Sequence, residues 1–418
     1  MSRAMKDSGI PWIGEIPKEW NCSKTKFFTR ISSGDGISNE ELQDGGEYEV
    51  LGGGSGIMGY HNNYNIDGDN LIIGRVGACG YVKRTNGKRY VSDNALIMRI
   101  TSNTLLFNYL YYVLTSAELS RLNTSTAQPL ITATKVYNVS IPLPSLAEQQ
   151  RIAEFLDRKC GEVDEMIALQ EQIIEELKAY KQSVITEAVT KGLNPDVPMK
   201  DSGIEWIGNI PEHWEVTKFY RICSVITDFV ASGSFESLRI NVPYLDYPDY
   251  AMLVRTVDLS GKGRAAEKVY ISKHSYDFLN NSNLFGGEII LPNIGASVGD
   301  VYIVPNLYER MSLAPNSIMF KTKQCDKYWY YYFYSEAGKQ SIFDICQSTA
   351  QPKFNKTELR DIRVCIPTND EQQAIADYLD EKCADIDSLI QTKQSKIDSL
   401  KEYKKSIIYE YVTGKREI

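Results

Sequence analysis

The sequence predicts an α+β protein in which two globular, mainly β heads alternate with two long helices. Three observations support this fold class: a motif that starts both halves, a helical segment that follows both heads, and two unlike segments between them. We expect the two helices to pair as an antiparallel coiled coil about a pseudo-twofold axis.

Length and composition set the first limits. A chain of 418 residues has room for two or three domains, and 43% hydrophobic with 24% charged residues is typical of globular proteins. No apolar run reaches the roughly 18 residues of a membrane span, and the start lacks the apolar core of a signal peptide. We therefore expect a cytoplasmic protein. Its 8 cysteines occur singly, without a CxxC pair, which predicts reduced thiols.

The acidic charge is confined to the helical segments. Lys and Arg number 5 against 10 Asp and Glu over residues 148–190, and 6 against 9 over residues 371–413. Over residues 21–144 the count is 11 against 10, and over residues 215–367 it is 17 against 16. The heads are therefore nearly neutral. The acidic helices suit a protein partner with a basic surface.

The repeat is visible in two long motifs. Residues 5–20, MKDSGIPWIGEIPKEW, return as residues 199–214, MKDSGIEWIGNIPEHW, and residues 148–160 return as residues 371–383. From residue 148 to 190 the two copies share 21 of 43 residues without a gap. The pentapeptide STAQP also occurs twice, at 125–129 and 348–352. Matches in this order and register establish a duplication.

The repeated helical segments carry a coiled-coil pattern. Apolar residues recur in steps of four and three, a period of 3.5 that is the signature of a coiled-coil seam. Both copies become polar at the same two steps, Gln170/Lys393 and Lys181/Lys404. Polar seam residues usually fix register at a cost in stability. The apolar seam comprises Leu156, Val163, Ile167, Ile174, Leu177, Leu379, Ile386, Ile390, Ile397 and Leu400.

These patterns give the domain boundaries. We expect the first head at 1–144, the first helix at 145–192, the second head at 193–367 and the second helix at 368–418. Gly and Pro residues between 191 and 198 mark the break between the halves. A helix of about 43 residues cannot bury its apolar stripe alone, and its copy in the same chain is the simplest partner. Packing of each helix on its own head, or dimerisation between chains, are the alternatives.

The heads show strand and helix signals in the same order. In each, a short apolar strand runs into a turn, at Gly77-Ala78 in head one and at Gly295-Ala296 in head two. Alternating residues at 81–84 and 94–100 predict further strands. The tyrosine-rich runs at 108–112 and 328–334 are typical of helices whose aromatic side chains join the core.

No catalytic or cofactor motif appears. The glycine-rich run at 52–59 lacks both the GxxxxGK[ST] of a P-loop and the setting of a dinucleotide site. The 3 histidines have no partners at metal-binding spacing, and no nucleophile elbow is present. The catalytic tetrapeptide of amino-methyltransferases, Asn/Asp/Ser-Pro-Pro-aromatic, is also missing. The residues therefore predict no active site and no metal site.

The order of these motifs resembles the specificity subunit of Type I restriction–modification systems. The resemblance rests on the doubled opening motif, on Pro144 and Pro367 ahead of the Glu-Gln-Gln segments, and on the runs at 51–60 and 75–80. It covers essentially the whole chain. Head two departs from it, with Pro292-Asn293 where head one has Gly74-Arg75, so a role of Arg75 need not transfer.

The resemblance implies a subunit without catalytic activity, whose two target-recognition domains each read one half of a split double-stranded DNA site. The helices would set the gap between the halves and dock two methyltransferase subunits. In such complexes the partners methylate adenine with S-adenosylmethionine, and restriction subunits add an ATP-driven endonuclease. S-adenosylmethionine, ATP and Mg would therefore belong to other subunits, and this chain would hold no cofactor.

Within the heads, base contacts are expected where the two copies differ, in polar and basic loops. Residues that both copies share should build the frame or touch phosphate, which suggests Gln128 and Gln351. The candidates in head one are Asp35, Ser55, Arg75, Lys83, Arg84, Lys88 and Arg89. The candidates in head two are Arg255, Lys262, Arg264, Asn293 and Lys353. For each of them a solvated surface charge is the alternative.

Two rival functions are also compatible with the sequence. One is a self-contained restriction or methylation enzyme with an unrecognised site, which an assay with S-adenosylmethionine and DNA would reveal. The other is a DNA-binding or scaffold protein without methyltransferase partners, which co-purification would reveal.

Overall fold

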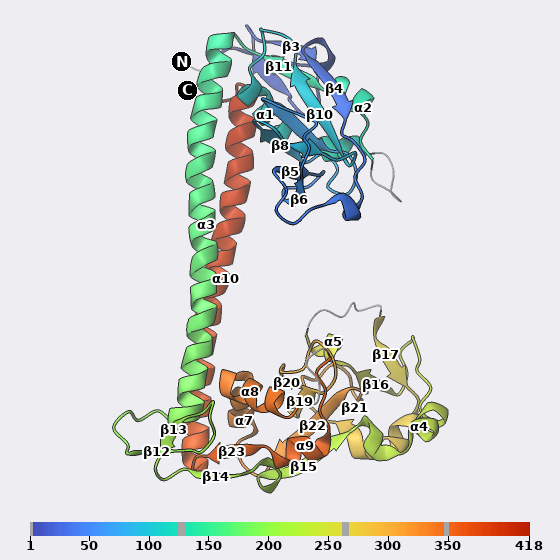
Figure 1. Ribbon diagram of the computed structural model, residues 1–418, viewed down its shortest axis with the longest axis vertical. Helices are drawn as coiled ribbons and strands as arrows, with labels where there is room; N and C mark the ends of the chain where they lie inside the picture. The colour runs from blue at the N-terminus through green and yellow to red at the C-terminus, as the bar shows by residue number, and fades with distance from the viewer. Residues whose placement is uncertain (1–2, 124–129, 261–266, 347–350) are drawn as a thin grey trace. The chain divides into compact units, whose positions relative to one another are not determined.

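The computed structural model describes residues 3–123, 130–260, 267–346 and 351–418. The chain forms two compact units. Unit 1 comprises Met1–Gln172 and Lys393–Ile418, and unit 2 comprises Ile173–Thr392. Each unit therefore contains one head together with part of both long helices (Figure 1).

Head one, in unit 1, is built on a four-stranded antiparallel sheet in the order β4-β10-β7-β8. A smaller sheet, β6-β5-β9, pairs β5 with β9 in parallel. The strands are β1 (Met5–Asp7), β2 (Glu15–Pro17), β3 (Asn21–Lys24), β4 (Thr29–Ser33), β5 (Tyr48–Leu51), β6 (Ile57–His61), β7 (Asn70–Gly74), β8 (Val82–Thr85), β9 (Tyr90–Val91), β10 (Ala95–Ile100) and β11 (Ser140–Leu143). The short helices are α1 (Phe107–Ser116) and α2 (Ala133–Tyr137).

Head two, in unit 2, repeats this plan. Its main sheet has the order β15-β22-β19-β20, and its second sheet, β17-β16-β21-β18, again contains one parallel pair. The strands are β12 (Met199–Asp201), β13 (Asn209–Pro211), β14 (Glu215–Lys218), β15 (Cys223–Asp228), β16 (Ala251–Val254), β17 (Val269–Ile271), β18 (Asn283–Leu284), β19 (Ile289–Pro292), β20 (Tyr302–Ile303), β21 (Met311–Leu313), β22 (Ser317–Thr322) and β23 (Arg363–Ile366). The helices are α4 (Phe235–Asn241), α5 (Thr256–Leu259), α6 (Lys273–Phe278), α7 (Asp326–Tyr334), α8 (Glu336–Asp344) and α9 (Lys356–Asp361).

The sheet registers confirm the duplication inside the heads. Gly74 at the end of β7 pairs with Ala95, and Pro292 at the end of β19 pairs with Ser317. The extra length of head two includes α4, α5 and α6 between β15 and β19. In head one, the described residues between β4 and β7 form no α-helix.

The apolar runs form the elements that their patterns predict. Strand β7 is buried along its length because both faces of its sheet are covered, and it leads into the turn that contains Gly77. In α1 and α7 the aromatic side chains Tyr109, Tyr328 and Trp329 are 0% exposed. The prediction that these tyrosine-rich runs are core helices is confirmed.

The long helices are α3 (Leu146–Lys191) and α10 (Asn369–Val412). In unit 1 the ring of Phe155 lies 4.4 Å from that of Tyr411, and Asp164 binds Lys404 at 2.6 Å. In unit 2, Lys181 binds Asp387 at 2.7 Å. Early residues of α3 thus lie beside late residues of α10, and late residues of α3 beside early ones of α10. The antiparallel pairing that the sequence predicts is confirmed within each unit.

The seam residues are mostly removed from solvent. Seven are buried, namely Leu156, Val163, Ile174, Leu379, Ile386, Ile397 and Leu400. Ile167, Leu177 and Ile390 are half-buried. The polar steps Lys181 and Lys404 place their ammonium groups on Asp387 and Asp164, which occupy equivalent positions in the two copies.

None of the helices in the described ranges combines the length and the apolar character that a bilayer span requires.

Candidate nucleic-acid interface

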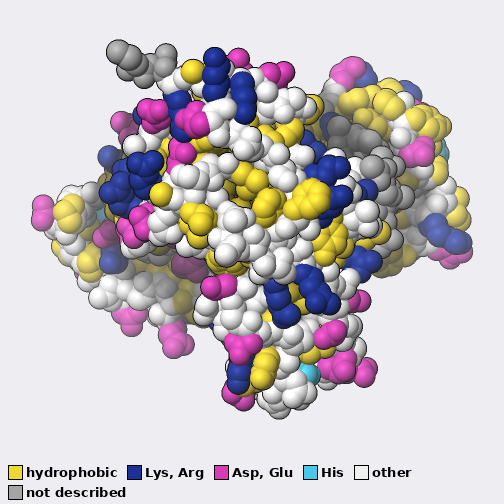
Figure 2. Space-filling model, turned by 90° about the horizontal axis from the view of Figure 1, so that it is seen from above, with side chains coloured by type: hydrophobic (Ala, Val, Ile, Leu, Met, Phe, Trp, Pro, Cys, Tyr) yellow, Lys and Arg dark blue, Asp and Glu magenta, His cyan; other side chains and the backbone are white. Residues whose placement is uncertain are grey.

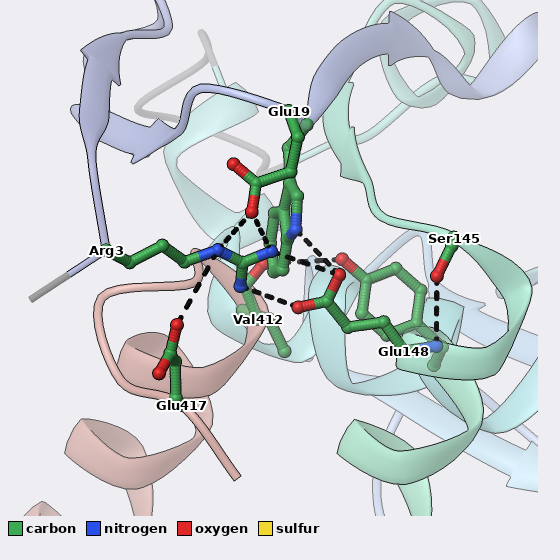
Figure 3. A network of polar contacts seen from close by, with 8 residues as sticks. Arg3, Glu19, Ser145, Glu148, Val412 and Glu417 are labelled. Carbon is green, nitrogen blue, oxygen red and sulfur yellow. Dashed lines mark hydrogen bonds and ion pairs between the residues drawn. The ribbon is translucent and has the colours of Figure 1, made fainter. Parts of the chain in front are cut away.

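The repeated motifs meet at the junction between each head and the helices, which we call the frame. In unit 1, Glu148 in the first turn of α3 accepts hydrogen bonds from the Trp20 indole at 2.9 Å and from Arg3 at 2.6 Å (Figure 3). Arg3 also pairs with Glu19 and lies 3.8 Å from Glu417. The hydrogen bond from Arg3 to Glu148 raises the pKa of Arg3. Segments from both ends of the described chain are therefore held at the start of α3.

The frame of unit 2 uses equivalent positions with one different partner. Glu371 accepts a hydrogen bond from the Trp214 indole at 3.3 Å, but a ring nitrogen of His213 lies 2.8 Å from it where unit 1 uses Arg3. Burial alone would raise the pKa of Glu371. The hydrogen bonds from His213, Thr368 and Trp214 outweigh that effect and lower it.

Further contacts of the frame are duplicated. The amide of Gln149 donates to the carbonyl of Pro144 at 3.0 Å, and the amide of Gln372 donates to Pro367 at 3.1 Å. Each of these glutamines is the second residue of a Glu-Gln-Gln motif and is buried. The repeated sequence motifs are thus the residues that fix each head to the helices.

Arg84 also belongs to a head–helix contact. Its guanidinium donates to Asp157 of α3 at 2.6 Å and lies 4.9 Å from the Tyr111 ring. Tyr112 donates to the same carboxylate at 2.8 Å. In unit 2, Asp380 takes the corresponding place, bound by Lys327 and by the Tyr331 hydroxyl at 2.8 Å. The charge of Arg84, a candidate DNA contact, is therefore already paired.

Three candidates of head one gather around the glycine-rich loop after β5 and the turn after β7. Lys83 donates to the Gly54 carbonyl at 2.7 Å, and its half-burial lowers its pKa. Ser55 is exposed at the tip of the loop. Arg75, after β7, has its Nη1 3.5 Å from the Ser33 hydroxyl, and its buried Nε has no hydrogen-bond partner.

The other candidates of head one have local partners. Asp35 accepts a hydrogen bond from Asn65 at 2.8 Å. Arg89 pairs with Glu49 at 2.9 Å, and the Lys88 ammonium lies 4.6 Å from the centre of the Tyr64 ring. Lys88 and Arg89 lie between β8 and β9, beside the smaller sheet.

In head two, Arg255 forms a two-point ion pair with Asp258, with both contacts at 3.0 Å. Asn293 donates to the Phe354 carbonyl at 2.8 Å, while its Oδ1 is buried without a partner. Lys353 pairs with Ile294 through the backbone, and both Lys353 and Gln351 have exposed side chains. The candidates Gln128, Lys262 and Arg264 lie outside the described residues, as does most of the repeated STAQP motif.

Sequence reasoning missed several residues around these sites. Asn65 ties Asp35 to the backbone of Val91, and Arg3 and His213 hold the frame glutamates. The tryptophans and glutamates repeated in both halves were a usable signal for the frame. Asn65 lies outside the motifs that the two heads share, and only the fold brings it to Asp35. Strand β6 and the segment after it also leave a group of large side chains partly exposed, namely Ile57, Met58, Tyr60 and Tyr64.

The surface charges are mixed. On the face that Figure 2 shows, Lys and Arg side chains form separate groups with Asp and Glu between them. The described ranges contain no group of three or more His, Cys, Asp and Glu residues that could hold a metal ion.

Comparisons with known proteins agree with the duplicated architecture. Residues 17–179 and 211–411 match the model of the type I restriction modification DNA specificity domain, so the model matches twice and spans well over half of the chain. The chain is 27% identical to the type I restriction enzyme MjaVIII specificity subunit of Methanocaldococcus jannaschii, over 79% of this chain and 75% of that protein. It is 21% identical to the EcoDI specificity subunit of Escherichia coli, over 90% of this chain and 84% of that protein.

A solved structure described as addressing complex assembly and conformational transition of the type I restriction–modification system has a similar fold. It matches with a TM-score of 0.67 at 12% identity, over 96% of this chain and 99% of that chain. In this chain the fold comprises two sheet-rich heads and two long helices that pair antiparallel within each unit. The two matches to the family model, one for each half of the duplicated chain, show that this protein belongs to the type I restriction–modification DNA specificity subunits.

Proposed function

We propose that each head reads one half of a bipartite, double-stranded DNA site, and that the chain does so without catalytic activity of its own. The recognition domains would span residues 1–144 and 193–367, and the helical segments residues 145–192 and 368–418. DNA sequence recognition as such follows from membership of the family. The assignment of one half-site to each head is our inference.

One observation supports this proposal. The contacts that attach each head to the helices are duplicated, whereas the loops of the two heads differ. Trp20 and Trp214 bind Glu148 and Glu371 in the same way. At the end of equivalent strands, however, head one has Gly74-Arg75 and head two has Pro292-Asn293. Base identity is read by side chains at base edges, so two heads with equivalent strands but different side chains are suited to two different half-sites.

We further propose that the paired helices set the gap between the half-sites and dock two methyltransferase subunits. Each unit presents one antiparallel helix segment with an acidic exposed surface, and equivalent surfaces suit two copies of one partner. In the complete complex, restriction subunits would join the assembly. S-adenosylmethionine, ATP and Mg would then act in those partners.

The test of the bipartite reading is a methylome comparison. A strain that carries this gene together with its methyltransferase gene should methylate adenines in a motif of two defined parts separated by a gap. Deletion of the gene for this chain should abolish that methylation. Methylation of a single uninterrupted motif would contradict the assignment of one half-site to each head.

The docking proposal has a separate test. Native mass spectrometry of the purified chain with an excess of methyltransferase should show two methyltransferase subunits per chain. The chain alone should show no methyltransferase, nuclease or ATPase activity. Saturation at one bound methyltransferase would contradict the proposal of two equivalent docking surfaces.

A further inference from the structure

The glycine-rich loop of head one, residues 52–56, is packed backbone against backbone. A Cβ atom on Gly74 would lie 2.4 Å from the Gly53 carbonyl oxygen, and one on Gly53 would lie 2.9 Å from the Asn94 carbonyl oxygen. Side chains at these two positions would therefore force the loop away from the turn after β7. The two glycines let the loop lie directly on this turn, with Ser55 exposed at its tip.

This loop has backbone donors to offer. Within the described ranges, no group accepts a hydrogen bond from the N–H groups of Gly54 and Ser55, and neither residue is buried. Neighbouring backbone N–H groups that no protein atom accepts are suited to bind an anion. A protein leaves such donors unpaired only where water or a ligand reaches them, since buried unpaired donors are costly.

A cation lies beside the same loop. The ammonium of Lys83 on β8 is 2.7 Å from the Gly54 carbonyl, and in the described ranges it forms no ion pair with a carboxylate. The nearby Glu49 is paired with Arg89 at 2.9 Å. Lys83 therefore brings a positive charge to the loop that no neighbouring acid cancels by direct contact.

Head two differs at the equivalent position. Lys83 lies opposite Ile72, two residues before the end of β7, and Tyr302 lies opposite Ile290, two residues before the end of β19. The Tyr302 hydroxyl donates to Asp300 at 3.1 Å. After β16, moreover, the chain enters α5 directly at Thr256 and has no glycine run. Head two thus has a phenol bonded to a carboxylate where head one has an ammonium, and the start of a helix where head one has the glycine-rich loop.

We propose that residues 52–56 and Lys83 form a phosphate-binding cradle of head one, which holds a phosphodiester of the DNA backbone and has no counterpart at the equivalent position of head two. The amides of Gly54 and Ser55 would donate to the phosphate oxygens, and the Lys83 ammonium would supply the charge. Contacts of this kind position a protein on the duplex and carry no sequence information. This inference rests on the proposed function, because it takes DNA as the ligand of head one.

The test compares two substitutions at Lys83 in the full chain assembled with its methyltransferase. Binding to a fluorescent DNA duplex that carries the methylated motif is measured by anisotropy over a range of salt concentrations. Lys83→Gln keeps a donor for the Gly54 carbonyl and removes the charge, whereas Lys83→Arg keeps the charge. Each neutralised phosphate contributes about −0.9 to the slope of log K against log salt.

We expect Lys83→Gln to make the slope less negative by about 0.9, which corresponds to about five-fold weaker binding at 0.15 M salt. Lys83→Arg should keep the slope of the unsubstituted protein. The methylated motif should be the same for both variants, because a phosphate contact does not read bases. Tyr302→Phe in head two is the matched control and should leave the slope unchanged.

The outcomes distinguish a failure of the phosphate-binding cradle from a failure of the proposed function. If the unsubstituted complex binds its motif and Lys83→Gln has the same slope, the cradle is refuted while the proposed function stands. A changed motif with Lys83→Gln would also refute it, because Lys83 would then read a base. If the unsubstituted complex shows no preference for the motif, the proposed function fails first. Thermal unfolding of both variants identifies any loss of binding that comes from misfolding.

Discussion

Head one and head two share a skeleton and differ in what they present. The main sheets have the same strand order, and the same glutamate and tryptophan positions attach each head to the helices. The loops after β5 and β16 and the side chains at Lys83 and Tyr302 have no such correspondence. The comparison shows that the duplicated residues maintain the frame, which leaves the intervening loops free to diverge in sequence and in length.

The largest expected effect tests whether equivalent seam residues contribute equally to the free energy of unfolding of the two units. Leu156 and Leu379 are the same position in the two copies, and both are 0% exposed. Truncation of a fully buried leucine to alanine costs about 2–5 kcal/mol of the free energy of unfolding. We expect Leu156→Ala to destabilise unit 1 and Leu379→Ala to destabilise unit 2, each by an amount in this range.

The measurement is hydrogen exchange of backbone amides in urea, which follows each unit separately in a chain that need not unfold in one step. Protection should fall mainly in the unit that carries the substitution. Equal loss of protection in both units after either substitution would show that they unfold together, and would contradict their description as two separate compact units.

A smaller effect concerns Glu371, the frame glutamate of unit 2. Glu371 has a lowered pKa in the folded protein because the hydrogen bonds from His213, Thr368 and Trp214 outweigh its burial. A carboxyl with a lowered folded pKa stabilises the fold above its unfolded pKa, and this contribution is lost as the pH falls through the folded pKa. Glu371→Gln should therefore destabilise unit 2 at neutral pH by about 1 kcal/mol or less, since the pair is partly exposed.

This difference between Glu371→Gln and the unsubstituted protein should shrink only below the ordinary pKa range of a carboxyl group. Urea titrations of both proteins at neutral and acidic pH, with hydrogen exchange in unit 2 as the signal, measure it. A difference that stays constant down to the most acidic pH would show that the carboxylate charge of Glu371 contributes nothing.

The smallest expected effect concerns the polar steps of the seam. Lys181–Asp387 and Lys404–Asp164 are equivalent ion pairs whose aspartates are 58% exposed. Exposed pairs contribute about 0.2–1 kcal/mol. Double-mutant cycles with Lys181→Met and Asp387→Asn, and with Lys404→Met and Asp164→Asn, should give coupling energies in this range and of similar size. A clear coupling in one unit and none in the other would break the pseudo-twofold equivalence of the helices.

The sequence was sufficient to predict the repeat, the long helices and their antiparallel pairing. Leu156 and Leu379 recur within patterns of period 3.5, and a local pattern of this kind reports directly on a helix face. The order of the sheets could not be predicted, because β4 pairs with β10 across a long stretch of chain and nothing in either strand specifies its neighbour. The shared strand order of the two heads therefore needed the structure.

The candidate interface was predictable only in part. Arg84 looked like a free cation in the sequence, because its partner Asp157 lies on the following helix and only the fold brings them together. Lys83 also looked like an isolated charge, and its position beside Gly54 depends on how the smaller sheet packs against the turn after β7. Residue type alone therefore could not separate a cation that holds the frame from one that is available to a ligand.

The most direct test of the central claim is an exchange of heads within an intact frame. Residues 21–124 would be replaced by the corresponding segment of another specificity subunit, which leaves the motif ending at Trp20 and both long helices unchanged. Methylome sequencing of a strain that carries the hybrid with the original methyltransferase reads both half-sites and the gap. One half of the methylated motif should change, while the other half and the gap should stay the same. A hybrid that is active but changes both halves together would contradict independent reading by the two heads.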